Sequence, residues 1–368
     1  AMIIEGAGSQ AEINLRRSDY ANMRVARMAG AFVLLVGDID RGGVFASLHG
    51  TLALLHREER DLVAGFVINK FRGDPSLLNS GLRFLETKWR RPVYGVVPFD
   101  LDLRLPEEDS LALTWRSNGT PSSIRHPKNS IVIGIVRTPH IANFTDFDPF
   151  RVEPDVVVRD VFSPADLPGL DALILPGSKN VFADLEFLRR TKLAAALQNN
   201  SKMEIVGVCG GLQILGYTMS DPAGVESGRP ARSDGIRLLP VRTRFLPTKI
   251  VRPVLRIHKP SRSTVRGYEI HHGKIFPLSR DSRPLFYSGA GIPEGCVSND
   301  GRVWGTLTHG LFDSDRFRNH FVNRLRKKAW LPSKPETRFE IENQIERAAS
   351  LVESHLDVRA ILRLLKKC

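Results

Sequence analysis

The chain has 368 residues, of which 42% are hydrophobic and 25% are charged. This length exceeds what a single hydrophobic core usually supports, so we expect a globular protein of two domains. The longest apolar stretch without a charge, Ala29 to Gly37, is too short to cross a bilayer. The first residues do not resemble a signal peptide, and three widely spaced cysteines predict neither a disulfide framework nor a zinc site. We therefore expect a cytoplasmic location.

The net charge of +13 raises the question of nucleic-acid binding. Lysine and arginine concentrate in Lys249 to Arg266 and in Arg316 to Lys328. Neither cluster is interleaved with aromatic residues that would stack on bases, and the chain carries no known nucleic-acid-binding motif. We expect no nucleic-acid partner, and a surface that favours anionic substrates. Within the second cluster, Phe317, Phe321 and Leu325 share one helical face, which predicts a terminal helix packed on the core.

In the first block, apolar strands alternate with helical patterns, as is typical of doubly wound α/β proteins. The predicted strands are Met2 to Glu5, Ala31 to Asp38, Leu62 to Asn69 and Pro92 to Pro98. A polar, turn-rich stretch from Arg116 to Asn129 follows. It predicts a first domain over 1–115 and a linker over 116–130.

The same alternation continues in a second block, for which we predict a domain over 131–330. Its predicted strands are Ile131 to Val136, Asp171 to Leu175, Ile205 to Val208 and Val303 to Leu307. A C-terminal helical extension over 331–368 is expected to contain one long helix from Glu340 to Leu365.

Cys209 stands between an apolar strand and a helical pattern that begins with Gly210 and Gly211. A thiol on such a turn is exposed to a substrate, and the start of a helix favours its thiolate form. The backbone N–H of Gly210 is then free to donate to an oxyanion. The alternative is a buried cysteine that acts as a small hydrophobic side chain.

A thiol nucleophile needs a base, and His309, directly after a predicted strand, is the best candidate among ten histidines. A packed or solvated histidine is the alternative. Gly177, in the Pro-Gly turn that ends the strand Asp171 to Leu175, could supply a second oxyanion donor. An ordinary strand-terminating turn is as plausible there when this segment is viewed alone.

Several longer motifs carry a resemblance to a known family. They are Glu5–Ser9, Ala11–Leu15, Gly37–Phe45, Asn69–Asp74, Leu105–Ser110, Pro139–Asp148 and Gly267–Gly273. With the Cys209 segment, these motifs resemble the class I glutamine amidotransferases that amidate corrin precursors of vitamin B12, and in particular the cobyric acid synthase family. The resemblance extends from Met2 to about Leu365.

The resemblance implies that Cys209 is the glutaminase nucleophile and His309 its base. It also implies that Gly177 and Gly210 are oxyanion donors and that Gln213 lies near the bound glutamine. Members of the wider class carry an acid two residues after the histidine, but this chain has Leu311 there. The corrin-amidating branch typically lacks that acid, so the group that orients His309 stays unnamed.

The resemblance further implies that the first block is an ATP-dependent synthetase domain of the dethiobiotin synthetase type. That domain normally begins with a glycine-rich phosphate loop ending in lysine, and the sole Gly-Lys pair of this chain, Gly273–Lys274, lacks the required spacing. We therefore expect a partial domain with weak or absent ATP binding. By resemblance, Glu5 and Asp38 would hold magnesium, whereas Asn69 and Lys70 would form a base-recognition turn. Alternatively, Glu5 is a surface strand residue, Asp38 favours a turn, and Asn69 and Lys70 belong to a plain loop.

The reaction that the resemblance implies is the amidation of peripheral carboxylates of adenosylcobyrinic acid a,c-diamide with ammonia from glutamine. ATP, with Mg²⁺ as its cofactor, would activate the carboxylates, and no prosthetic group is expected. Two alternatives stay open, a cobyrinic acid a,c-diamide synthase and a truncated, non-catalytic remnant or subunit. A parallel sheet that lacks its phosphate-loop strand should leave an open edge near Ile3 and Ile4. We expect that edge to cause self-association or to pair with a separate N-terminal chain.

Overall fold

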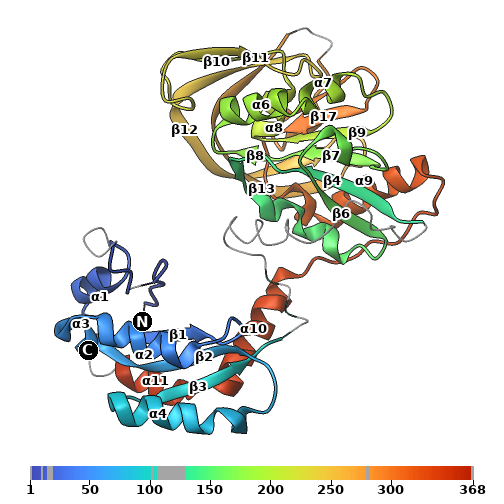
Figure 1. Cartoon of the computed structure of the whole chain (residues 1–368). Coiled ribbons are helices and arrows are strands. Elements are labelled where there is room, and N and C mark those ends of the chain that lie inside the picture. Colours follow the sequence, from blue (N-terminus) through green and yellow to red (C-terminus); the bar gives the residue numbers. More distant parts are fainter. Residues whose placement is uncertain are drawn as a thin grey trace. The chain divides into compact units, whose positions relative to one another are not determined.

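The computed structural model describes residues 2–9, 11–14, 20–100, 103, 105, 129–278 and 282–365. The chain forms two compact units (Figure 1): unit 1 comprises Ala1–Leu105 and Glu340–Cys368, and unit 2 comprises Pro106–Phe339. The expected linker over 116–130 lies outside the described residues, except for its last two. The C-terminal extension expected over 331–368 is divided between the units, because 331–339 belong to unit 2 and the part from Glu340 on belongs to unit 1.

Unit 1 contains a parallel sheet with the strand order β1-β2-β3. Its strands are β1 (Val33–Asp38), β2 (Val63–Phe71) and β3 (Val93–Pro98), which confirms three of the predicted strands. The helical segments of the first block are α1 (Met23–Ala29), α2 (Val44–Leu54), α3 (Arg57–Leu62), η2 (Pro75–Leu78) and α4 (Asn79–Trp89). Helices α2 and α4 cover one face of the sheet, where Leu52 and Leu85 pack with Phe66.

The prediction of a strand over Met2 to Glu5 is wrong. These residues form exposed coil, and the side chain of Ile3 is 97% exposed. A strand needs a neighbour to complete its backbone hydrogen bonds. Among the described residues, β1 pairs with β2 and with no segment near Ile3.

The prediction of one helix from Glu340 to Leu365 is also wrong, because two helices stand there. Helix α10 (Ile341–His355) ends before Asp357, whose side chain caps α11 (Val358–Leu364) by accepting a 2.9 Å hydrogen bond from Ala360 N. The backbone N–H of Asp357 donates to the carbonyl of Tyr94 on β3. Figure 1 shows α10 and α11 against β3, and Leu351, Leu356, Ile361 and Leu364 pack there with Val67, Tyr94 and Val97.

The central sheet of unit 2 has the order β16-β17-β9-β7-β4-β6. Its strands are β4 (Ile131–Val136), β6 (Val156–Val161), β7 (Ala172–Leu175), β9 (Glu204–Val208), β16 (Cys296–Val297) and β17 (Val303–Thr306). All neighbours are parallel except β16 and β17. This arrangement confirms the four strands predicted in the second block and its α/β class.

Helical segments cover both faces of this sheet. On one face lie α6 (Val181–Arg190), α7 (Leu193–Gln198) and α8 (Gly210–Leu215). On the other lie η3 (Phe144–Val152) and α9 (Asp315–Lys328), with η4 (Pro164–Asp166) and η5 (Leu311–Asp313) in the connections. Phe317, Phe321 and Leu325 of α9 are buried, as the sequence predicted.

A second sheet of unit 2 was not predicted. It consists of β10 (Thr218–Asp221), β11 (Ala231–Asp234), β12 (Val241–His258), β13 (Thr264–Pro277), β14 (Phe286–Ser288) and β15 (Pro293–Glu294). The long antiparallel pair β12–β13 dominates it, and Figure 1 shows β12 as a strongly bent strand. A separate short pair joins β5 (Ile141–Ala142) to β8 (Gly177–Ser178). Over the described ranges, every helix is too short or too polar to pass through a membrane.

Candidate functional site

Cys209 occupies the sharp turn between β9 and α8. Its backbone has φ 50° and ψ −105°, which is a strained conformation for a residue with a side chain. Close packing of the turn requires Gly211, because a Cβ there would lie 2.0 Å from the carbonyl oxygen of Leu175. The backbone N–H of Cys209 donates to the carbonyl of Thr306 at 2.7 Å, so the turn is tied to the end of β17.

His309 follows β17 at the same sheet edge. Val208 and Thr306 are direct neighbours in the parallel pair β9–β17, which brings the two strand ends together. The backbone of His309 is held by two hydrogen bonds with Tyr268 on β13, of 2.8 and 3.2 Å. The thiol of Cys209 is close enough to the imidazole to raise its pKa, and it approaches the carbonyl of Ile270 at 3.9 Å. The structure therefore brings the two residues of the expected catalytic pair together.

Asp146 orients His309. Its Oδ2 lies 2.7 Å from Nδ1 of His309, and its Oδ1 accepts a 2.9 Å hydrogen bond from the backbone N–H of Gly310. The carboxylate sits on η3 and is 3% exposed. Sequence reasoning left this position unnamed, because Asp146 lies 163 residues before the histidine. The one available signal was its place in the Pro139–Asp148 motif.

The electrostatics of His309 favour its charged form. Burial alone would lower the pKa of the imidazole, but the hydrogen bonds to Asp146 and Cys209 and their negative charges outweigh that effect and raise the pKa to about 10. A protonated His309 places a positive charge and a proton donor beside Cys209. The imidazolium can then deliver a proton to a leaving group.

Tyr268 covers the imidazole. Its ring stacks on His309 with centroids 5.2 Å apart and planes at 20°. Its hydroxyl oxygen accepts a 2.6 Å hydrogen bond from Nδ2 of Asn143. Burial and the charge of Asp146 raise the pKa of Tyr268, so the phenol stays neutral. Sequence reasoning listed both residues within motifs and gave neither a role.

The expected oxyanion and glutamine-binding residues surround the pair. Gly177 lies against His309, since a Cβ on it would be 2.9 Å from the imidazole Cε1. Gly210 begins α8 and faces the backbone nitrogen of Ser178. Gln213, one turn into α8, is buried, and its amide nitrogen approaches Gly273 on β13. The roles expected for these three residues stay predictions.

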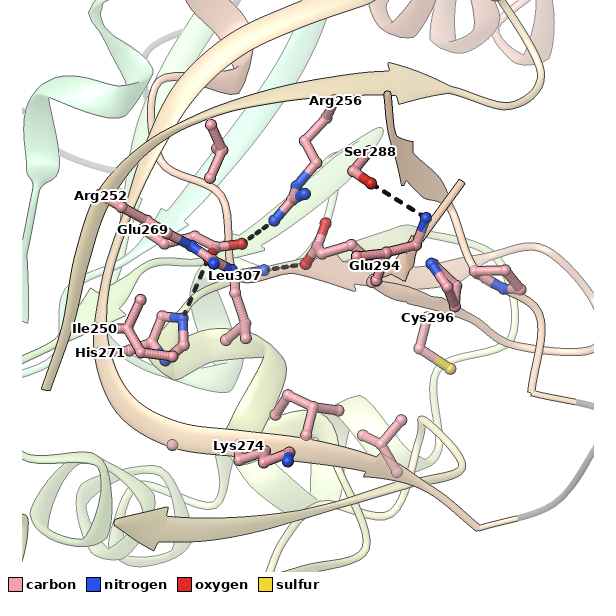
Figure 2. A pocket seen from close by; sticks show the side chains of 18 of the residues that line it. Ile250, Arg252, Arg256, Glu269, His271, Lys274, Ser288, Glu294, Cys296 and Leu307 are labelled. Carbon is pink, nitrogen blue, oxygen red and sulfur yellow. Dashed lines mark hydrogen bonds and ion pairs between the residues drawn. The ribbon is translucent and has the colours of Figure 1, made fainter. Parts of the chain in front are cut away.

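Residues of β12, β13 and β15 border a cavity of about 960 Å³ (Figure 2). Glu269 bonds there to Arg252 and Arg256, and His271 lines the same space. Glu294, whose pKa is raised by burial, accepts hydrogen bonds from Thr306 Oγ1 at 2.6 Å and from Leu307 N at 2.7 Å. Thus Glu294 fixes the chain just before His309.

In unit 1, three of the four residues expected at a nucleotide site come together. Asp38 and Asn69 are direct neighbours at the ends of β1 and β2, and Lys70 Nζ lies 2.8 Å from Asp38 Oδ2. Burial would raise the pKa of Asp38, but the hydrogen bond and charge of Lys70 lower it overall. Glu5 lies in exposed coil, and no hydrogen bond or ion pair joins it to Asp38 in the described residues. The carboxylate of Asp38 is paired with Lys70, and the described residues include no group of three histidine, cysteine, aspartate or glutamate side chains that could hold a metal ion. The magnesium role expected for Glu5 and Asp38 stays a prediction.

Comparison with known proteins gives a consistent result. Residues 132–317 match the model of the CobB/CobQ-like glutamine amidotransferase domain, and residues 5–112 match that of the CobQ/CobB/MinD/ParA nucleotide binding domain. These matches agree with the two kinds of α/β unit expected from the sequence.

Curated relatives match along almost the whole chain. A cobyric acid synthase of Nitratidesulfovibrio vulgaris is 40% identical over 99% of the chain and 74% of its own length. That of Geobacillus thermodenitrificans is 44% identical over 100% of the chain and 73% of its own length. An adenosylcobalamin biosynthesis bifunctional protein of Leptospira interrogans is 41% identical over 98% of the chain, which covers 42% of that protein. The chain belongs to the cobyric acid synthase family.

Proposed function

We propose that unit 2 hydrolyses glutamine and supplies the ammonia with which a cobyric acid synthase amidates peripheral carboxylates of adenosylcobyrinic acid a,c-diamide. The observation that carries this proposal is the buried His309–Asp146 pair, which follows β17 beside the end of β9, where Cys209 stands. The relatives' names favour cobyric acid synthase over a cobyrinic acid a,c-diamide synthase.

In the proposed reaction, the Cys209 thiolate attacks the side-chain amide carbon of glutamine and forms a C–S bond. The carbonyl oxygen becomes an oxyanion, for which backbone N–H groups at Gly177 and Gly210 are the proposed donors. The imidazolium of His309 gives its proton to the departing nitrogen, and the C–N bond breaks. Ammonia departs, and Cys209 is then joined to the glutamyl group as a thioester. His309 then accepts a proton from water, which attacks the thioester carbon. The C–S bond breaks, glutamate leaves, and the Cys209 thiolate and the His309 imidazolium are restored.

Asp146 keeps the imidazole in place through this cycle. Its Oδ2 accepts from Nδ1, which leaves Nε2 for the thiol and the leaving group. The synthetase half would require ATP, which supplies phosphoryl activation of the corrin carboxylate when it is bound. We propose that the nucleotide binds at the strand ends that carry Asp38, Asn69 and Lys70. The match of residues 5–112 to a nucleotide binding domain supports this proposal. Glutamine and the corrin substrate are the proposed small-molecule partners.

Active-site labelling tests the glutaminase proposal. The chain is incubated with 6-diazo-5-oxo-L-norleucine, a reactive glutamine analogue, and the modified peptide is mapped while glutamate release is measured separately. We expect the label on Cys209 and a loss of glutamate release in Cys209→Ala. Burial raises the pKa of the Cys296 thiol to about 11, so at pH 8 this residue serves as an internal control that stays unlabelled.

The base is tested in the same assay. His309→Ala should slow labelling of Cys209 by about 10³-fold or more, because the thiolate and its proton donor act as one unit. A label on Cys296 or Cys368 in place of Cys209 contradicts the assignment, as does labelling at the wild-type rate in His309→Ala.

A further inference from the structure

A buried carboxylate outside the group of Cys209, His309 and Asp146 joins two backbone segments. Asp184 lies on the first turns of α6 and is 0% exposed. Its Oδ1 accepts a 3.0 Å hydrogen bond from the backbone N–H of His140 and lies 3.0 Å from the Nδ1 of the same residue. Its Oδ2 accepts a 2.6 Å hydrogen bond from the hydroxyl of Ser178. One side chain thus bonds to residues on both sides of the β5–β8 pair.

The helix itself does not need this carboxylate as a cap. Asn180 already caps α6, since its side-chain oxygen accepts a 3.0 Å hydrogen bond from Ala183 N. A charged side chain without solvent contact is costly unless its hydrogen bonds compensate. Within the described part of the chain, the side-chain bonds of Asp184 go to His140 and Ser178, so the burial of its carboxylate is explained by these two segments.

The same two segments are tied to each other through the backbone. Ile141 pairs with Ser178, Ala142 pairs with Gly177, and Lys179 N donates to the carbonyl of His140 at 2.8 Å. The Ser178 hydroxyl also accepts a 3.0 Å hydrogen bond from Asn180 N. Strand β8 is therefore held in two ways. The side chain of Asp184 bonds to Ser178, and the backbone of β5 pairs with that of β8.

Strand β8 borders the thiol and its base. Gly177 is packed against the imidazole of His309, and the backbone nitrogen of Ser178 lies 2.9 Å from the place where a Cβ of Gly210 would be. These groups are closely packed. A displacement of β8 by a few tenths of an ångström would therefore change the distance between its backbone N–H groups and a substrate atom bound at Cys209. Oxyanion stabilisation depends strongly on such distances.

We propose that Asp184 is a positioning residue for the oxyanion donors of β8. It holds the Gly177–Ser178 backbone at the distance at which its N–H groups stabilise the tetrahedral intermediate, and it touches neither the thiol nor the imidazole. This inference rests on the proposed glutaminase function.

The test compares two reactions of Cys209 in the full chain. Glutamine hydrolysis passes through an oxyanion, whereas alkylation by iodoacetamide does not, so alkylation reports only the thiolate and His309. Asp184→Ala removes all the side-chain bonds, and Asp184→Asn keeps the shape and most of the partners. Asp166→Ala is a matched control, because Asp166 also accepts three hydrogen bonds, from Phe162 N, Ser163 N and Ser163 Oγ, away from the catalytic residues.

For Asp184→Ala, we expect kcat of glutamine hydrolysis to fall about 100-fold, with KM changed less than about threefold, because the donors act in the transition state. The rate of iodoacetamide alkylation at Cys209 should stay within about twofold of wild type, as should both rates in Asp166→Ala. The kcat of Asp184→Asn should be about tenfold higher than that of Asp184→Ala. If Asp184→Ala does not fold, Ser178→Ala replaces it, with an expected loss of about tenfold in kcat and the same unchanged alkylation.

Equal falls in kcat and in alkylation rate would overturn the proposal, since they would mean general damage to the site. A kcat for Asp184→Ala equal to that of the Asp166→Ala control would overturn it as well. The failure of the glutaminase function is visible separately, because a wild-type chain that releases no glutamate fails before any variant is compared.

Discussion

The two units place polar side chains at the ends of parallel strands in different ways. In unit 2, Cys209, His309 and Asp146 are buried, and every contact between them is within a packed core. In unit 1, the ion pairs Asp38–Lys70 and Asp40–Arg72 join side chains that are between 31% and 51% exposed. Low dielectric and fixed neighbours make polar contacts strong in the first case, whereas water weakens them in the second.

This difference teaches which unit is organised for chemistry in the described state. In unit 2, the proposed nucleophile Cys209, the proposed base His309 and the carboxylate of Asp146 that bonds to it are all buried. The strand ends of unit 1 hold a lysine on the carboxylate that the sequence assigned to a metal. Substitutions in the two units should therefore have very different effects.

The largest effect is expected for Asp146→Asn. The amide removes the negative charge beside His309 and permits the wrong tautomer of the imidazole, so kcat of glutamine hydrolysis should fall on the order of 10³-fold. Steady-state glutamate release measures this loss. An activity within tenfold of wild type would show that Asp146 does not orient the base.

The same variant has a pH signature. The pKa of His309 is raised in the folded state to about 10, so its pairing stabilises the fold fully below the unfolded value near 6.5 and is lost as the pH rises through 10. Hence the difference in melting temperature between wild type and Asp146→Asn should be largest at pH 6.5 and should shrink towards pH 10. A difference that grows with pH would contradict the charged form of His309.

A smaller effect, on stability alone, is expected for Glu153→Gln. Glu153 is buried and accepts hydrogen bonds from Arg318 Nε at 3.1 Å, Arg326 Nη2 at 3.0 Å and Thr337 Oγ1 at 2.5 Å. Removing its charge leaves two buried guanidinium groups undercompensated, which should lower the free energy of unfolding by about 3 kcal/mol. Urea denaturation followed by circular dichroism measures this change. Asp234→Asn, at an exposed pair with Arg237, is the control and should cost less than about 0.5 kcal/mol.

The smallest effect is expected for Arg72→Ala in unit 1. Arg72 pairs with Asp40 at 2.8 Å and lies over the ring of Phe99, but its side chain is 51% exposed. We expect a loss of less than about 1 kcal/mol in the free energy of unfolding and glutaminase activity within about twofold of wild type. A loss as large as that of Glu153→Gln would remove the contrast between the two units.

The strands of the central sheets could be predicted because they are apolar runs with little ambiguity. Ile131–Val136 was predicted residue for residue, since all six residues are buried and its five side chains are apolar. Strand β12 could not be found in this way, because arginines and prolines interrupt its apolar residues and much of it is exposed to water. The strand expected over Met2 to Glu5 shows the converse error, in which local apolar character occurs without a partner strand.

Sequence reasoning could place Cys209 and His309, since each follows a strand and parallel strands end at one sheet edge. Asp146 could not be assigned, because it reaches the histidine from a 3₁₀ segment on another part of the chain. The same holds for Asp184, whose helical position gives no hint that it holds β8. Contacts between distant segments set both roles, and no local pattern records them.

The packing of α10 and α11 on β3 also bears on the order in which the molecule can be completed during synthesis. Unit 1 uses residues from both sides of unit 2, so the ribosome finishes unit 2 while Val67, Tyr94 and Val97 still lack their covering helices. Domains tend to fold as soon as they are made. Unit 2 can therefore form its core first. One apolar face of the β1-β2-β3 sheet stays uncovered until the segment that begins at Glu340 has been synthesised.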